Sequence, residues 1–239
     1  MSIPVNNIVK KRVVTDTELE HVIKMALMSK DENRACHAGL LLCCFGTGMK
    51  PSELAKLIVS DYLHEDGLIR TPSVVRAEIA FNGYERPIYW LNQLSNISHS
   101  LLVVMNSYLA TRGGVGLGRN IGVPFRGLEP SAPLFVSLPA TEGHPLFPQS
   151  RVPFRAEQVS MQISRLFEQA GMVKVTTQCA RRSLATKLLR RGISPCFIGE
   201  LLGLNSLRAI KLLCMDVRPS LHDVMHGGGQ SENSVAFLY

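Results

Sequence analysis

The sequence predicts a mainly α-helical domain with a small antiparallel β-sheet. The chain has 239 residues, of which 46% are hydrophobic, so it is long enough to bury the core of one domain. In most segments the apolar residues recur with the spacing of amphipathic helices. The exception is the stretch between Gly67 and Leu91, where short, partly β-branched runs flank Asn82-Gly83, a hairpin signal.

Three helices are expected before the hairpin. The stretch Thr15-Asp16-Thr17-Glu18 offers an N-cap with early acidic residues and predicts a helix over residues 17–29. Residues 32–44 are apolar on most helical faces, which is typical of a helix at the centre of a bundle, and a Gly-Thr-Gly segment ends this helix. Pro51 is then expected to begin a short third helix that ends near Ser60 and Asp61.

The second half of the chain is expected to contain a long loop and five helices. Residues 112–153 are rich in glycine and proline, and their G-x-G has neither the preceding strand nor the following helix of a nucleotide-binding site. Gly171, Gly192 and Gly203 are suitable helix stops. The helices are expected at residues 101–110, 155–170, 178–191, 195–202 and 206–214.

The charge balance favours an anionic partner. The 26 Lys and Arg residues exceed the 19 Asp and Glu residues, for a net charge of +7. This excess is compatible with nucleic acid, although it describes only non-specific attraction. The longest uncharged apolar run, residues 35–49, is shorter than the ~20 residues that cross a bilayer, and the N-terminus lacks the apolar core of a secretory signal. We therefore expect a cytoplasmic protein without membrane contact.

No metal site, cofactor or disulfide framework is expected. The cysteines include no C-x-x-C pair and are expected to be reduced and buried. His222 and His226 have a metal-like spacing, but no third ligand is evident, so a surface helix is the preferred interpretation. The cysteines are Cys36, Cys43, Cys44, Cys179, Cys196 and Cys214.

Two segments carry a resemblance to a known family. Residues 46–54 read G-T-G-M-K-P-S-E-L, and residues 178–186 read Q-C-A-R-R-S-L-A-T. In this order and spacing they resemble the two signature boxes of the catalytic domain of tyrosine recombinases, the phage integrase family. With the hairpin and a strand at 133–135, the resemblance extends over about residues 15–215 and implies the fold of that domain.

The resemblance also implies a set of catalytic roles. Family members use a tyrosine to attack a DNA phosphodiester, two arginines to hold the transition-state charge, and a hairpin lysine with two further residues to assist proton transfer. Arg181 keeps its role, whereas Lys50 keeps only the charge of the first arginine, and the leucine at the nucleophile position cannot attack phosphorus. We predict a degenerate member without catalytic residues. The six positions hold Lys50, Phe81, Gln178, Arg181, Leu204 and Leu213.

Several basic and polar residues are candidates for contacts with DNA phosphates. Four residues of the helix at 178–191, Ser183, Lys187, Arg190 and Arg191, fall close together on one face and predict a phosphate-binding stripe. The alternative is a solvated face near a helix C-terminus, where the dipole favours cations. The candidates are Lys50, Gln178, Arg181, Arg182, Lys187, Arg190 and Arg191.

The expected organisation is a basic arm over residues 1–14, a recombinase-like domain over 15–226 and a flexible tail over 227–239 with an apolar tip. The expected function is that of a DNA-binding, non-catalytic accessory or regulatory factor in the integration or recombination of a mobile element. Two alternatives stay open. One is an interaction module that docks through its tail on an active recombinase or on itself; the other is an active recombinase with a displaced nucleophile, Tyr239 or Cys214.

Overall fold

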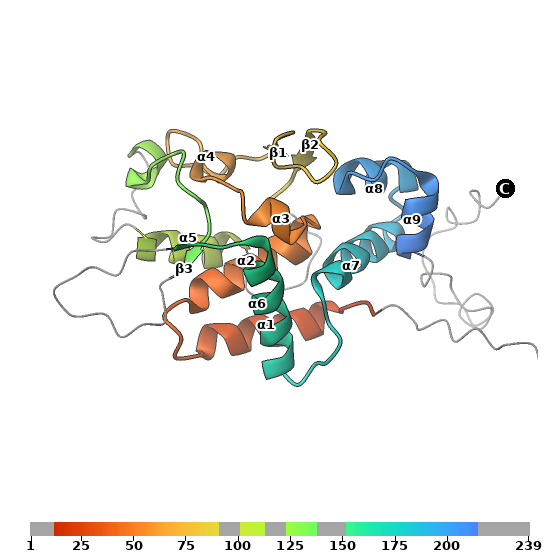
Figure 1. Cartoon of the computed structure of the whole chain (residues 1–239), viewed down its shortest axis with the longest axis horizontal. Helices are drawn as coiled ribbons and strands as arrows, with labels where there is room; N and C mark the ends of the chain where they lie inside the picture. Colours follow the sequence, from red (N-terminus) through yellow and green to blue (C-terminus); the bar gives the residue numbers. More distant parts are fainter. Residues whose placement is uncertain (1–11, 91–100, 113–122, 138–151, 215–239) are drawn as a thin grey trace, which may run out of the picture.

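Helix α2 (Arg34–Thr47) is the central element of the fold. Almost all of its residues are buried, because α1 (Asp16–Met28), α5 (Leu101–Arg112), α6 (Ala156–Gln169) and α7 (Thr177–Arg190) pack against it (Figure 1). The computed structural model describes residues 12–90, 101–112, 123–137 and 152–214. The prediction of a mainly α-helical fold with a small antiparallel sheet is confirmed, and so is the central position of the apolar helix.

Local sequence signals account for the ends of the first two helices. Thr15 caps α1, since its Oγ1 accepts a hydrogen bond from the Glu18 N–H at 3.2 Å and the Glu18 carboxylate accepts one from the Thr15 N–H at 2.9 Å. Helix α2 runs almost a turn further than predicted, to Thr47. It ends at Gly48, whose φ of 66° lies in the left-handed region.

The single short helix predicted after α2 is wrong, because two one-turn helices stand there instead, α3 (Pro51–Leu54) and α4 (Val59–Tyr62). Between them the backbone pairs with a distant segment: the Leu134 N–H donates to the Leu57 carbonyl at 2.7 Å. A carbonyl engaged in this way is not available to a continuing helix. The interruption therefore depends on a partner far away in the sequence.

Strands β1 (Ser73–Val75) and β2 (Arg86–Ile88) form the predicted antiparallel sheet. Pro87 in β2 has no N–H, which a two-stranded sheet tolerates because both strands are edges. The hairpin signal Asn82-Gly83 lies between the strands, near the end of the longer connection that residues 76–85 form.

The region predicted as a long loop contains some regular structure. Strands β3 (Val136–Ser137) and β4 (Val152–Pro153) form a second antiparallel pair, and η2 (Pro124–Gly127) is a short 3-10 helix. Residues 113–122 and 138–151 lie outside the described residues. Within the described part, the loop prediction therefore holds only between these elements.

The C-terminal helices form a smaller cluster beside the main core. Helices α8 (Pro195–Leu202) and α9 (Leu207–Cys214) pack on each other and on α7 (Figure 1). Their contact is lined by buried leucine, alanine and isoleucine side chains that are separate from the main core. Gly171, Gly192 and Gly203 follow helices with φ of 77°, 76° and 65°, which confirms them as helix stops.

Several sequence predictions concern exposure or lie beyond the described residues. Cys196 is exposed, so the prediction that the cysteines are buried is wrong at this position, where α8 presents its outer face to solvent. Among the helices that the structure describes, none is long and apolar enough to cross a membrane. Residues 1–11 of the arm, His222, His226 and the tail 227–239 lie outside the described residues.

Candidate functional site

The two motif segments meet in the structure, although more than 120 residues separate them. Arg181, in α7, donates from Nη1 to the Gly48 carbonyl at 2.8 Å and from Nη2 to the Leu202 carbonyl at 2.6 Å. Only 7% of Arg181 is exposed. A guanidinium carries five N–H donors, so these two bonds do not exhaust its capacity. Arg181 therefore joins the end of α2 to the end of α8.

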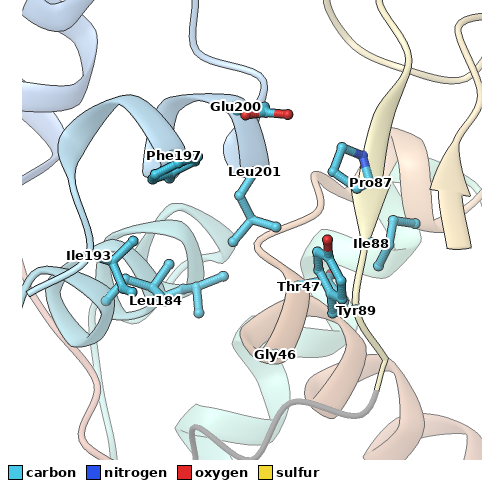
Figure 2. A pocket seen from close by; sticks show the side chains of 11 residues that line it. Gly46, Thr47, Pro87, Ile88, Tyr89, Leu184, Ile193, Phe197, Glu200 and Leu201 are labelled. Carbon is cyan, nitrogen blue, oxygen red and sulfur yellow. The ribbon is translucent and has the colours of Figure 1, made fainter. Parts of the chain in front are cut away.

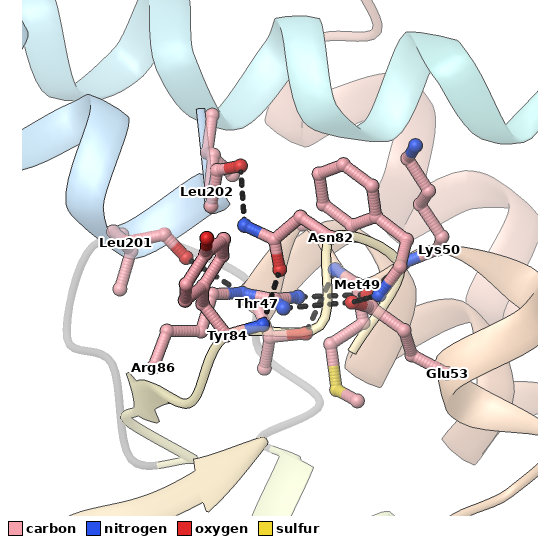
Figure 3. Close-up of polar contacts among 12 residues, drawn as sticks. Thr47, Met49, Lys50, Glu53, Asn82, Tyr84, Arg86, Leu201 and Leu202 are labelled. Carbon is pink, nitrogen blue, oxygen red and sulfur yellow. Dashed lines mark hydrogen bonds and ion pairs between the residues drawn. The ribbon is translucent and has the colours of Figure 1, made fainter. Parts of the chain in front are cut away.

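A buried ion pair supports this junction from the side of α3. Arg86, in β2, donates from Nη1 and Nη2 to the two carboxylate oxygens of Glu53, each at 2.7 Å (Figure 3). The same carboxylate accepts the backbone N–H groups of Lys50 at 2.8 Å and Phe81 at 3.2 Å. Burial raises the pKa of Glu53, but the hydrogen bonds and charge of Arg86, together with the backbone bonds from Lys50 and Phe81, outweigh burial and hold this pKa below its ordinary value.

The connection between β1 and β2 is also tied to the end of α8. Asn82 donates from Nδ2 to the Gly203 carbonyl at 3.0 Å, and Arg86 donates from Nε to the Leu201 carbonyl at 3.2 Å (Figure 3). The sheet, α3, α7 and α8 thus share one hydrogen-bonded network. Sequence analysis did not single out Glu53, Asn82 or Arg86 as site residues, because nothing local indicates that they meet.

Three cationic side chains surround the ring of Phe81 within this network. The Lys50 Nζ lies 3.4 Å from the ring centroid, and the guanidinium carbons of Arg181 and Arg86 lie at 5.1 and 5.8 Å. Cations within about 6 Å of a ring face are attracted by its quadrupole. Glu53 contributes one negative charge to these three positive charges, so the cluster has an excess of positive charge.

Burial and mutual repulsion shift the pKa values of the cations in this cluster. Burial lowers the pKa of Arg181 to about 10, which still leaves it charged at neutral pH. Burial also lowers the pKa of Lys50, and repulsion from Arg181 adds to this effect. Both shifts are those of cations held in a partly desolvated site without a full complement of anions.

Three further positions given by the resemblance hold no group that could transfer a proton or attack phosphorus, namely Gln178, Leu204 and Leu213. Gln178 is exposed in the first turn of α7. Leu204 and Leu213 pack against the small cluster formed by α7, α8 and α9. Aliphatic side chains transfer no protons and attack no phosphorus, so these two positions serve packing.

The predicted basic stripe on α7 is partly covered by the chain that precedes α1. Ser183 accepts the Val14 N–H at 2.8 Å, and Lys187 forms an ion pair with Asp16. Arg182, which is 8% exposed, donates to the Arg12 carbonyl at 3.3 Å. These side chains hold the N-terminal segment on α7.

Arg190 and Arg191 are exposed at the end of α7. Arg190 follows Arg181 by 190 − 181 = 9 residues, which turns it by about 180° around the helix. The structure therefore does not bring the predicted DNA-binding residues together: Lys50 and Arg181 lie in the cationic cluster, Arg182 and Lys187 contact the N-terminal segment, and Arg190 and Arg191 are exposed at the end of α7.

An apolar pocket opens beside the cationic cluster, between α7, α8 and β2 (Figure 2). Its volume is about 480 Å³, and Glu200 is the charged residue among the described residues that line it. Phe197, at its edge, is 67% exposed. Sequence analysis missed this pocket, although an aromatic residue on the polar side of a short helix was a usable signal. Its lining includes Thr47, Ile88, Tyr89, Leu184, Ile193 and Leu201.

Comparison with known proteins assigns the chain to a family. A sequence model of the phage integrase family matches residues 12–212, which is most of the chain and includes both motif segments. The chain belongs to the phage integrase family. Among curated proteins, none matches the chain significantly in sequence.

Solved structures of several recombinases have a similar fold. XerA recombinase superimposes with a TM-score of 0.59 at 21% identity, over 90% of this chain and 63% of its own. XerH, bound to a palindromic difH substrate, has a TM-score of 0.57 at 18% identity, over 89% of this chain and 52% of the XerH chain. A lambda integrase dimer bound to a core site has a TM-score of 0.51 at 17% identity, over 87% and 62%. The chain thus spans just over half to almost two thirds of these relatives.

Metal ligands do not cluster within the ranges that the structure describes: no group of three or more His, Cys, Asp or Glu side chains there could hold a metal ion. The described site instead offers cations and hydrogen-bond donors. Such groups bind and orient a phosphate.

Proposed function

We propose that this chain binds double-stranded DNA through backbone phosphates and acts in DNA integration or recombination as a non-catalytic accessory or regulatory factor of a mobile element. The observation that carries the proposal is the convergence of Lys50, Arg86 and Arg181 around one ring, with Glu53 as their counterion. A phosphate would neutralise the remaining positive charge. The net charge of +7 adds non-specific attraction to the duplex.

The composition of the site supports a role without strand cleavage. The nucleophile position given by the resemblance is Leu213, and the proton-transfer positions hold Phe81, Gln178 and Leu204. Family relatives in complex with DNA support DNA as the partner. A site that retains cations but no nucleophile is suited to holding a phosphodiester without breaking it.

Lys50 is the residue with which to test phosphate binding, since Arg181 also holds the fold together. Replacing Lys50 with alanine should weaken binding to duplex DNA about tenfold at low salt, because one charge-assisted contact is lost. The slope of log affinity against log salt should become shallower by roughly 0.9. Equilibrium titration of a labelled duplex at three salt concentrations measures both quantities.

Lys30→Ala is the matched control, since Lys30 is exposed in the connection between α1 and α2 and carries the same charge. It removes the same charge and should leave the slope nearly unchanged. Equal effects of the two substitutions, or wild-type affinity that does not depend on salt, would contradict the proposed phosphate site. A covalent protein–DNA adduct would contradict the non-catalytic role.

Arg190 and Arg191 test whether the exposed end of α7 also contacts DNA. If the duplex extends over this end, Arg190→Ala with Arg191→Ala should reduce the salt slope by up to about 2. The same titration measures it. An unchanged slope would leave these arginines as a solvated face near the helix C-terminus, where the dipole favours cations.

The apolar pocket favours a second candidate function, docking of an apolar segment from another protein molecule. The tail, residues 227–239, ends in V-A-F-L-Y and follows in sequence the helices that line the pocket. We propose that the tail of a second copy of this chain docks in the pocket. The alternative to be tested is that the tail docks on an active recombinase. Burial of such side chains on association is favourable.

Deletion of residues 227–239 should then abolish self-association, which sedimentation velocity of the full chain measures. Phe197→Glu should act in the same way, because it places a charge beside the pocket and Phe197 is too exposed to support the fold. Self-association that survives both changes, or a full chain that stays monomeric, would rule out pairing through this pocket.

A further inference from the structure

The ring of Phe81 occupies the centre of the cationic cluster. Lys50 Nζ lies only 3.4 Å from its centroid, closer than either arginine. The ring thus fills the space in front of the cations and offers them the negative face of its π-system. No carboxylate other than Glu53 forms an ion pair with these cations within the described residues.

The backbone and packing of Phe81 hold the ring in this position. Its N–H donates to the Glu53 carboxylate at 3.2 Å, which ties the residue to α3. On the other side, the ring carbon Cε1 lies 3.3 Å from the point where a Cβ at Gly203 would stand. The next residue, Asn82, donates to the Gly203 carbonyl. The side chain of Phe81 itself makes no hydrogen bond and turns about its own χ angles without breaking any of these bonds.

We propose that Phe81 is a gate, whose ring has to leave Lys50 and Arg181 before a phosphate anion binds between them. The anion and the ring compete for the same cations, since a phosphate oxygen at hydrogen-bond distance from Lys50 Nζ would occupy the space that the ring fills. This inference rests on the proposed function. It adds that the phosphate site is closed in the free protein and that Phe81 sets its affinity.

Removal of the ring should therefore strengthen phosphate binding. Phe81→Ala is expected to bind duplex DNA about three- to thirtyfold more tightly than wild type at low salt, the range that corresponds to loss of a partly buried cation–π contact. Phe81→Leu keeps apolar packing against Gly203 but has no π-face, and should also bind more tightly. Phe81→Tyr keeps the aromatic ring and should bind DNA less tightly than Phe81→Ala.

Two further measurements test whether the gain in DNA affinity comes from uncovering the cations that the ring of Phe81 covers. In Phe81→Ala with Lys50→Ala the gain should be smaller, because the cation that lies closest to the ring is absent. Inorganic phosphate, compared with chloride at equal ionic strength, should raise the unfolding temperature of Phe81→Ala more than that of wild type, since binding to the folded state stabilises it.

The outcomes of these measurements distinguish the gate from the proposed function. If wild type binds DNA with the expected salt dependence and both folded variants, Phe81→Ala and Phe81→Leu, bind no more tightly, the gate is refuted while the function stands. If no variant binds DNA but inorganic phosphate stabilises Phe81→Ala more than wild type, the gate stands and the proposed function fails. A gain that is equally large with and without Lys50 would also refute the gate.

Discussion

Replacement of Arg86 with alanine should destabilise the fold by about 3–5 kcal/mol. The reason is that Glu53, which is fully buried, would lose the two hydrogen bonds and the positive charge that compensate its burial. For a domain of this size, 3 kcal/mol corresponds to a fall in unfolding temperature of about 6–12 °C. Chemical denaturation at neutral pH gives the free energy of unfolding directly.

The matched control is the double replacement Glu53→Leu with Arg86→Met, which removes both charges and keeps apolar volume. Apolar replacement of a whole buried pair is often nearly neutral, so the double variant should be more stable than Arg86→Ala. If Arg86→Ala costs less than about 1 kcal/mol, the pair is not a main support of the site.

The same pair should make stability depend on pH in the acid range. The hydrogen bonds from Arg86 hold the folded-state pKa of Glu53 below its ordinary value of 4.5, although burial opposes them. A lowered carboxyl pKa contributes stability that is fully present above the unfolded value and is lost as the pH falls through the folded value. The unfolding free energy of wild type should therefore fall below about pH 4.5, more steeply than that of Glu53→Gln.

Gly48→Ala should be the second large effect, with a loss of about 2–4 kcal/mol. Gly48 has a φ of 66°, which costs a residue with a Cβ about 1–2 kcal/mol. In addition, the new Cβ would stand 2.4 Å from Leu202 Cδ2 and 3.2 Å from Leu184 Cδ2, so either the Leu202 side chain or the whole of α8 has to move. A shift of α8 would also disturb the Leu202 carbonyl that Arg181 binds.

Gly171→Ala is the control for the backbone contribution alone. Gly171 has a φ of 77°, but no described atom lies within 4 Å of the position that a Cβ would take there, so only the left-handed conformation is penalised. The difference in unfolding free energy between the two variants measures the close contact at Gly48. Equal losses would show that α8 is free to move away from α2 without cost.

Interactions close in sequence were predictable. The Thr15–Glu18 capping box, the glycine stops and the apolar character of α2 each depend on residues within a few positions of one another, so the local pattern contains them. The order of the two motif segments was enough to predict the family. Whether Lys50 and Arg181 lie in one site depended on the tertiary structure, which brings both cations to the ring of Phe81.

Interactions between distant residues were not predictable in the same way. The break between α3 and α4 depends on pairing with residues 133–134. On α7, Ser183 and Lys187 belong to the predicted phosphate-binding stripe but instead bind Val14 and Asp16. In both cases a bond to a partner far away in the chain decides the outcome. The periodicity of one segment contains no information about such a partner.

The sequence by itself determined which segments of this protein are helical, which family it belongs to and which residue types stand at the site. Only the tertiary structure decided what those residues do: that Arg86 neutralises Glu53, that Arg181 binds two carbonyls, and that Phe81 lies on Lys50. The physical reason is that caps and helical stripes arise from neighbours along the chain, whereas charge compensation and ring contacts arise from side chains that only folding brings within a few ångströms.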